Sequence, residues 1–383
     1  MAEGTGPNRT GAHLSLQTTQ PQKWGQGWIS GTLSIALGGI GLGTVLCFHF
    51  PGQFTLPSLR EQYPLVYVLV LLHLVLVSGF LLGTISLWLR YNKALGLVGI
   101  LLALTAALLG GSQVPVGQAA GEGGWLGLDW FLLNLILYSV VYLPLERLFA
   151  LYPQQPVFRM GWQTDLTYFF LNTLLVQTTT LLTLSPAMIL FDWAKITSLV
   201  RLVESSPLLI QVIGAIMVAD FTQYWIHRTL HTIPLLWRFH AVHHSAQSMD
   251  WLAGSRLHLF DVILTRALTY VPIYLLGFSQ TAVILYVIVV VIQATFIHAN
   301  VHWKFRPLRW LIATPHFHHW HHSAEKEAMD KNFAVHTPVW DLLFGTFFLP
   351  ERWPGAYGLS NGDQVPKGWL GQFFYPFWSR SKT

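Results

Sequence analysis

Ten histidines between His227 and His322 fall into four short clusters. The first and third clusters are pairs four residues apart, and the second and fourth have the pattern H-x-x-H-H. On a helix, residues three and four apart share a face, so each cluster can direct its imidazoles toward one point. Neutral imidazole is a common protein ligand of iron, copper, zinc and nickel. The ten residues are His227, His231, His240, His243, His244, His298, His302, His318, His321 and His322.

The number of histidines predicts how many ions they hold. Ten imidazoles are too many for one first-row metal, which seldom takes more than about six ligands, and suit two ions at roughly five each. The pattern therefore predicts a two-metal site. Five histidines lie between His316 and His322, and His316 and His319 also have a three-residue spacing. Spacing alone leaves the register of the last cluster open.

The composition predicts where such a site lies. Of the 383 residues, 52% are hydrophobic and only 10% are charged, with a mean hydropathy of +0.46. A soluble domain has about 25% charged residues, so the composition indicates a membrane protein. The net charge of +5 suits an anionic membrane surface, and we expect no nucleic-acid partner. The single cysteine, Cys47, excludes a disulfide framework, a cysteine-ligated iron–sulfur cluster and a C-x-x-C-H haem attachment.

Long apolar runs predict the elements that position the histidines. Each is long enough for a membrane helix or close to it, and the fold class is predicted as an all-α, polytopic transmembrane helical bundle. A later apolar run, Leu257–Ile297, fits two helices or a re-entrant hairpin, which returns His298 to the side where His244 leaves. The first six predicted spans are Trp28–Phe50, Pro64–Leu89, Ala94–Gly111, Trp125–Leu145, Leu166–Phe191 and Ser205–Ile226.

The charged loops predict the orientation. If the N-terminal tail is cytoplasmic, alternate loops place an excess of Lys and Arg on the cytoplasmic side, as the positive-inside rule requires. The histidine-rich metal domain is then expected to face the cytoplasm. The residues expected inside are Arg9, Lys23, Arg90, Lys93, Arg147 and Arg159, and those expected outside are Arg60, Lys195 and Arg201.

The clusters resemble the histidine boxes of the fatty acid hydroxylase / sterol desaturase superfamily of integral-membrane di-iron enzymes. The pair His298 and His302 is similar to a box present in many members. Thr314-Pro315 resembles the start of the family's T-P-x-x-H-x-x-H-H, which favours the register that uses His318. The resemblance covers roughly residues 217–348, and the spans before residue 153 are outside it.

A further segment is similar to the family's R-x-H-P-x-E. Here Arg256-x-His258-x-x-Asp261 has Leu259 in place of the proline and Asp261 in place of the glutamate. Ligating imidazoles usually need a partner on the second ring nitrogen. We expect such partners, or contacts to substrate, from Asp220, Arg256, His258, Asp261, Asn300 and Asn332.

The resemblance implies a chemistry and a domain plan. It implies two Fe2+ ions, replaceable by zinc on purification, that use O2 to hydroxylate or desaturate a lipid alkyl chain or sterol, with no catalytic residue beyond the ligands. Electrons would come from an external cytochrome b5-like or ferredoxin-like donor. The predicted parts are a disordered tail (1–27), about four membrane helices (28–152), a catalytic domain (153–350) and an aromatic and basic membrane-interface tail (351–383).

Three other classes use clustered histidines. A metal transporter or zinc-binding protein would place ligands near the membrane midplane, whereas these lie at the ends of predicted spans. A zinc hydrolase with H-E-x-x-H needs a glutamate, and Arg228, Thr229 and Leu230 separate the first pair instead. A bis-histidine haem protein does not explain the paired H-H steps. The oxidoreductase is the main hypothesis, and the transporter or zinc-binding protein is the alternative.

Overall fold

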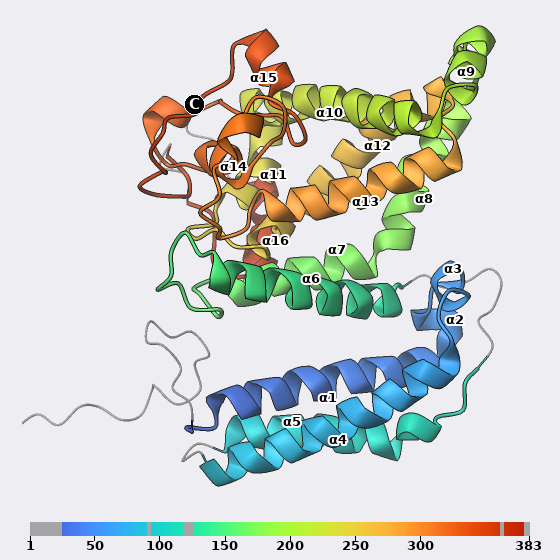
Figure 1. Ribbon diagram of the computed structural model, residues 1–383, viewed down its shortest axis with the longest axis vertical. Helices are drawn as coiled ribbons and strands as arrows, with labels where there is room; N and C mark the ends of the chain where they lie inside the picture. The colour runs from blue at the N-terminus through green and yellow to red at the C-terminus, as the bar shows by residue number, and fades with distance from the viewer. Residues whose placement is uncertain (1–24, 90–92, 118–125, 361–363, 379–383) are drawn as a thin grey trace, which may run out of the picture. The chain divides into compact units, whose positions relative to one another are not determined.

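A computed structural model describes residues 25–89, 93–117, 126–360 and 364–378 (Figure 1). The described residues form α-helices and short 3-10 turns without a β-strand, as the sequence predicts, apart from two isolated bridges. Residues 1–24 of the predicted tail lie outside the described residues. The chain divides into two compact units, residues 1–137 with 154–159 and residues 138–153 with 160–383. The predicted domain boundaries remain a prediction.

The first unit is built on three long apolar helices, α1 (Trp28–His49), α4 (Leu65–Leu89) and α5 (Ala94–Leu108). Small residues allow their backbones to approach closely, as in other membrane helix pairs. The Ser34 hydroxyl donates to the Gly79 carbonyl across 2.6 Å. The unit also contains α2 (Pro51–Phe54), α3 (Pro57–Arg60) and the first half of α6 (Leu128–Leu148).

The second unit carries all four histidine clusters. Its helices α12 and α13 each pack on α10, and short helices and loops gather at one end of these helices (Figure 1). The helices are α7 (Trp162–Leu174), α8 (Val176–Phe191), α9 (Thr197–Glu204), α10 (Leu208–Thr232), α11 (Pro234–His244), α12 (Leu259–Leu276), α13 (Gln280–Phe296), α14 (Pro315–His321), α15 (Val339–Phe344) and α16 (Trp369–Trp378).

Two of the predicted spans need correction. The predicted fifth span, Leu166–Phe191, is two helices, α7 and α8, which meet at a 52° bend. The predicted sixth span ends at Ile226, but α10 continues to Thr232, so His227 and His231 lie on its last turns. The run Leu257–Ile297, predicted as two helices or a re-entrant hairpin, contains the two helices α12 and α13. Residues 277–279 separate them, and Gly277 has a φ of 71°, which suits glycine.

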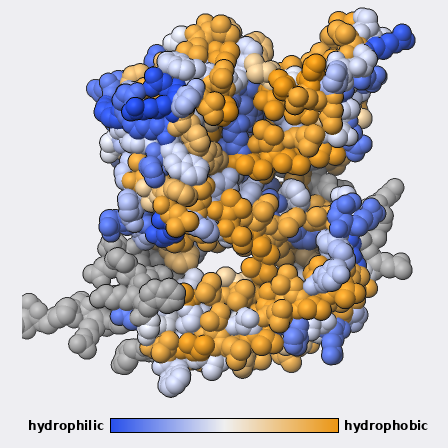
Figure 2. Space-filling view, viewed as in Figure 1, coloured by the Kyte–Doolittle hydropathy of each residue, from blue (hydrophilic) through white to orange (hydrophobic). Residues whose placement is uncertain are grey.

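Among the residues that the structure describes, six helices are long and apolar enough to cross a membrane, and the bent α7–α8 pair would make a seventh. Their outward faces are apolar, as expected for helices that contact lipid. Figure 2 shows apolar residues along the flanks of the long helices of the second unit and hydrophilic residues over the loops around α14. The protein is therefore a multi-pass membrane protein.

Gly38 and Gly39 of α1 provide a direct test of the packing in the first unit. A Cβ on Gly38 would lie 2.9 Å from the Gly99 carbonyl oxygen, whereas one on Gly39 meets no described atom within 4 Å. We expect Gly38→Ala to lower the free energy of unfolding by about 1–3 kcal/mol through overpacking. Gly39→Ala should be neutral or stabilise by about 0.5–1 kcal/mol. Unfolding in detergent measures both, and equal effects would contradict this packing.

Candidate metal centre

Nine of the ten predicted ligands converge in two adjoining groups. In each group, one candidate ligand atom per residue lies within 4.8 Å of all the others. The five-histidine group consists of His227, His231, His240, His244 and His321. The four-histidine group consists of His243, His298, His318 and His322.

Helix geometry explains how each H-x-x-H-H cluster serves both groups. On α11, His240 and His244 are four apart and enter the five-histidine group, while His243 enters the four-histidine group. The last cluster does the reverse: His318 and His322 enter the four-histidine group, and His321 enters the five-histidine group. The paired H-H step therefore divides imidazoles between two neighbouring points, because consecutive helical residues diverge by about 100°.

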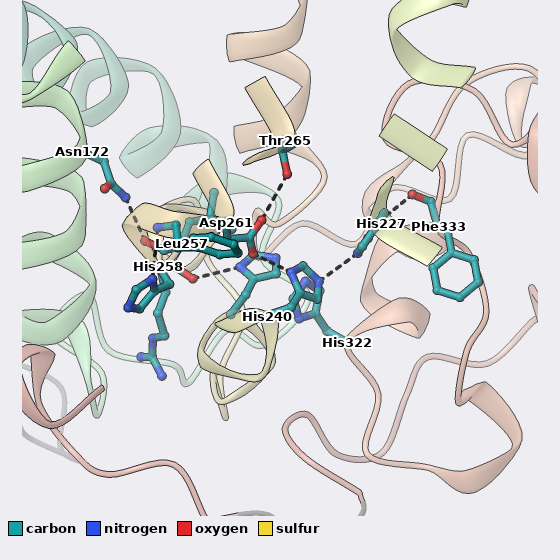
Figure 3. Close-up of polar contacts among 12 residues, drawn as sticks. Asn172, His227, His240, Leu257, His258, Asp261, Thr265, His322 and Phe333 are labelled. Atoms are coloured by element: carbon teal, nitrogen blue, oxygen red, sulfur yellow. Dashed lines mark hydrogen bonds and ion pairs between the residues drawn. The ribbon is translucent and has the colours of Figure 1, made fainter. Parts of the chain in front are cut away.

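Hydrogen bonds fix the tautomers in the five-histidine group. His227 donates from Nδ1 to the Phe333 carbonyl (2.7 Å), and His240 donates from Nδ1 to the Asp261 carboxylate (2.7 Å) (Figure 3). Neither oxygen has a proton to give, so the Nε2 atom of each neutral ring carries a lone pair. These two Nε2 atoms face each other at 3.0 Å. Two ligands at about 2.1 Å from one metal and about 90° apart have this separation.

The four-histidine group repeats the arrangement. His243 donates from Nδ1 to the Arg256 carbonyl (3.1 Å), and His298 donates from Nδ1 to the Ala294 carbonyl (2.6 Å). Their Nε2 atoms are 3.3 Å apart. The Nε2 atom of His318 lies 3.0 Å from that of His298 and 3.1 Å from that of His322. Facing lone pairs repel unless a cation lies between them, so the donor set fits a bound metal.

Burial favours the neutral form of these imidazoles, which is the form that can bind a metal. Burial, followed by the neighbouring imidazoles, lowers the pKa of His243, His244 and His318 well below its ordinary value. The same causes lower the pKa of His321 and His322. Buried ring nitrogens without a hydrogen-bond partner are costly, and bound metal would satisfy them. In the five-histidine group these atoms are Nε2 of His231, His244 and His321. Among the described residues, Nδ1 of His318 and His322, whose Nε2 atoms face into the four-histidine group, and Nε2 of His336 also lack a hydrogen-bond partner.

His302, which the sequence predicts as a ligand, is not brought together with the other nine histidines. His302 is exposed and donates from Nδ1 to the Phe149 carbonyl, outside both groups. The four-residue spacing misleads because α13 ends at Phe296, so His298 and His302 do not share a helical face. In the last cluster, the structure brings together His318, His321 and His322. His316 donates instead to the Arg352 carbonyl, and His319 bonds the Tyr357 hydroxyl.

Two of the six predicted partner residues contact the groups directly. They are Asp261, through its carboxylate, and Arg256, through its backbone carbonyl. The other four bind elsewhere. His258 accepts from the Phe260 amide and donates to the Phe373 carbonyl, and Asn300 bonds the backbone of Tyr152.

Asp220 and Asn332 hold loops around the centre. Asp220 accepts from the amides of residues 335–337, and Asp341 accepts from those of residues 333 and 334. Two carboxylates thus bind five consecutive N–H groups. Asn332 donates to the carbonyls of Phe317 and Phe348 and accepts from the Phe348 amide.

The loop before residue 334 supplies contacts that sequence reasoning missed. The Phe333 carbonyl accepts from His227, and the Lys331 carbonyl accepts from Nδ1 of His321 at 2.8 Å. Asp330 lies 3.4 Å from Nδ1 of His231. Asp330 and Asn332 have φ values of 54° and 59°, a left-handed conformation that Asp and Asn tolerate best after glycine. The only sequence signal for this loop was the residue types Asp330 and Asn332, which tolerate a left-handed backbone. The carbonyl acceptors left no signal, because every residue type has a carbonyl group.

A cavity of about 270 Å³ lies beside the five-histidine group. The imidazoles of His231, His244 and His321 form part of its wall, together with Trp237 and Asp330. The five-histidine group is therefore reachable from outside the described fold.

The fold and the two groups define a helical membrane protein with a cluster of histidines that fits a metal site. Residues 212–346 match the family described as Fatty acid hydroxylase. The match identifies a fatty acid hydroxylase domain in this part of the chain.

Characterised relatives share part of the chain. It is 34% identical over 171 residues to the ornithine lipid hydroxylase OlsE of Rhizobium tropici, covering 45% of this chain and 51% of that protein. It is 29% identical over 148 residues to the alkylglycerol monooxygenase of Homo sapiens, covering 39% and 33% respectively. It is 29% identical over 147 residues to the fatty acid hydroxylase vlmA of a Lecanicillium species, covering 34% and 40%. The chain thus spans about half or less of the length of these relatives, and no solved structure matches it.

The different positions of His298 and His302 predict opposite effects on metal binding. We expect His298→Ala to lower bound metal from about two ions per chain to about one, because it removes a ligand from the four-histidine group. His302→Ala should leave the content unchanged. Elemental analysis of purified protein measures both. An equal loss of bound metal in the two variants would indicate that His302 is a ligand.

The metal-free protein should lose stability in mild acid. Burial lowers the pKa of His298 to about 4 and that of His319 to about 3. An unfolded imidazole takes up its proton near pH 6.5. The unfolded chain then binds more protons than the folded chain below that pH, so the stabilising contribution is complete above it and is lost as the pH falls.

We therefore expect the thermal midpoint of metal-free protein to fall between about pH 6.5 and pH 4. The exposed His302→Ala variant is the control and should follow the same curve. A midpoint that stays constant across this range would contradict the burial of neutral imidazoles.

Proposed function

We propose that this protein is a membrane-bound di-iron oxidoreductase that uses O2 to hydroxylate a lipid. The observation that carries the proposal is the pair of facing, lone-pair-bearing imidazole groups inside a fatty acid hydroxylase domain. Relatives named for hydroxylation of ornithine lipid, monooxygenation of alkylglycerol and hydroxylation of fatty acid support a lipid as the substrate class.

The nine converging histidines are proposed as the ligands. Bound iron would supply the activation of O2, and the overall reaction is R–H + O2 + 2 electrons + 2 protons → R–OH + H2O. Residues of this chain orient the imidazoles. Asp261 holds the proton of His240 on Nδ1 and so directs the basic Nε2 atom inward, and the Phe333 carbonyl does the same for His227.

The membrane helices provide the route for substrate. His227 and His231 lie on the last turns of α10, so the metal centre lies at the end of an apolar span. An alkyl chain in the lipid beside α10, α12 and α13 could therefore reach the centre without crossing water. We place this end on the cytoplasmic side, where an external cytochrome b5-like or ferredoxin-like protein would deliver the two electrons. The excess of Lys and Arg in alternate loops supports this orientation.

Isotopically labelled O2 tests the proposal. Cells that produce the protein are grown with labelled O2, and their lipids are compared by mass spectrometry with those of cells that lack it. We expect label in a hydroxylated lipid. His243→Ala should lower this product by more than about 100-fold, because losing a hydrogen-bond partner of a metal ligand already costs about 10- to 100-fold in activity and losing the ligand itself should cost more. His302→Ala, the matched control, should retain it.

Two results would contradict this function. One is hydroxylated lipid without label, and the other is equal activity of His243→Ala and the unsubstituted protein. Metal uptake into sealed vesicles that depends on His243 would instead support transport, although ligands clustered at a helix end do not suit a path through the midplane.

A further inference from the structure

Helix α7 contacts residues 255–257. Residues 256 and 261 of this part of the chain each bind one imidazole, His243 and His240, of the two groups. Helix α7 itself lies outside the domain match at residues 212–346. We infer that Asp165 and Asn172 of α7 are positioning residues for the four-histidine group. They act through residues 255–257, which they hold in place beneath His243. The inference rests on the proposed binding of two metals and identifies how one of the two sites is oriented.

The contact begins with a buried ion pair. Arg256 donates from Nε to the Asp165 carboxylate at 2.5 Å, and it also donates to the Ser245 hydroxyl at 3.2 Å. Asp165 is fully buried and Arg256 is 6% exposed. Loss of one partner of such a pair leaves an uncompensated buried charge, so the geometry of this contact is strongly enforced.

Asn172 binds the backbone on both sides of Arg256. Its side-chain amide donates to the Leu257 carbonyl at 3.1 Å and to the Ser255 carbonyl at 3.4 Å (Figure 3). The intervening carbonyl, that of Arg256, is the acceptor for Nδ1 of His243. Helix α7 thus fixes residue 256 through its side chain and through the carbonyls of the residues before and after it. The direction of the Arg256 carbonyl, and with it the ring of His243, depends on these three contacts.

The chain after Arg256 also contacts the five-histidine group, through a separate hydrogen bond. Five residues after Arg256, the Asp261 carboxylate accepts from His240 of the five-histidine group and from the Thr265 hydroxyl. Asp261 lies on α12 and makes this contact directly. Changes in α7 should therefore affect the four-histidine group first, whereas changes at Asp261 should affect the five-histidine group.

Iron retention by the full-length protein in detergent tests this separation. Asn172→Leu removes the two hydrogen bonds that the side-chain amide donates, without leaving a buried charge. Asp165→Asn removes the carboxylate charge. We expect each to release one of two irons to a chelator at about a tenfold lower chelator concentration than the unsubstituted protein, the low end for partners outside the ligand shell. Thr167→Ala is the control, because this exposed hydroxyl bonds only within α7 in the part of the chain described.

Mössbauer spectra of isotopically enriched iron identify which ion is affected. The His298→Ala variant assigns the signal of the four-histidine group by its loss. Asn172→Leu and Asp165→Asn should alter that signal, and Asp261→Ala should alter the other. Retention and spectra equal to those of the unsubstituted protein would overturn the inference, as would equal changes in both signals, which indicate general loosening. If the unsubstituted protein binds no iron, the proposed function fails instead.

Discussion

The two histidine groups of the second unit depend on nine clustered imidazoles, eight of them buried, that each direct a ring nitrogen inward. A neutral imidazole offers a lone pair on one nitrogen only when the other carries the proton, and that proton needs an acceptor. The acceptors here are mostly backbone carbonyls, at Ala294, Arg256, Lys331 and Phe333, with one carboxylate, Asp261. The loops that carry these carbonyls are consequently as important to the centre as the histidines.

The division of each H-x-x-H-H cluster couples the two groups mechanically. Helix α11, and helix α14 together with its C-cap His322, each contribute imidazoles to both groups, in opposite proportions. A shift of either short helix must therefore disturb two sites at once. The spacing between the groups is set by the helical step between consecutive residues, which is a rigid quantity. The contacts of α7 and of Asp261 act at a finer level, because each reaches a single imidazole.

The sequence was sufficient wherever local geometry decides the outcome. Apolar runs located the membrane helices, and three- and four-residue spacings located the histidines that share α10, α11 and α14. The four-residue spacing did not bring His302 to the other histidines, because α13 ends at Phe296 and the spacing places residues on one face only within a helix. The bend between α7 and α8 was not predicted, because an uninterrupted apolar run does not show where a helix changes direction. Carbonyl acceptors were not predictable, since any residue type offers the same carbonyl.

Asp220 shows how an ionisable residue near a membrane can serve structure instead of chemistry. Its carboxylate, fully buried on α10, accepts three amides of residues 335–337. These three hydrogen bonds offset the cost of burying the carboxyl group. The carboxylate ties the loop after the last histidine cluster to the helix that carries the first. Residues far apart in the chain thus form one centre because a carboxylate fixes the backbone between them, and the Phe333 carbonyl then lies against His227.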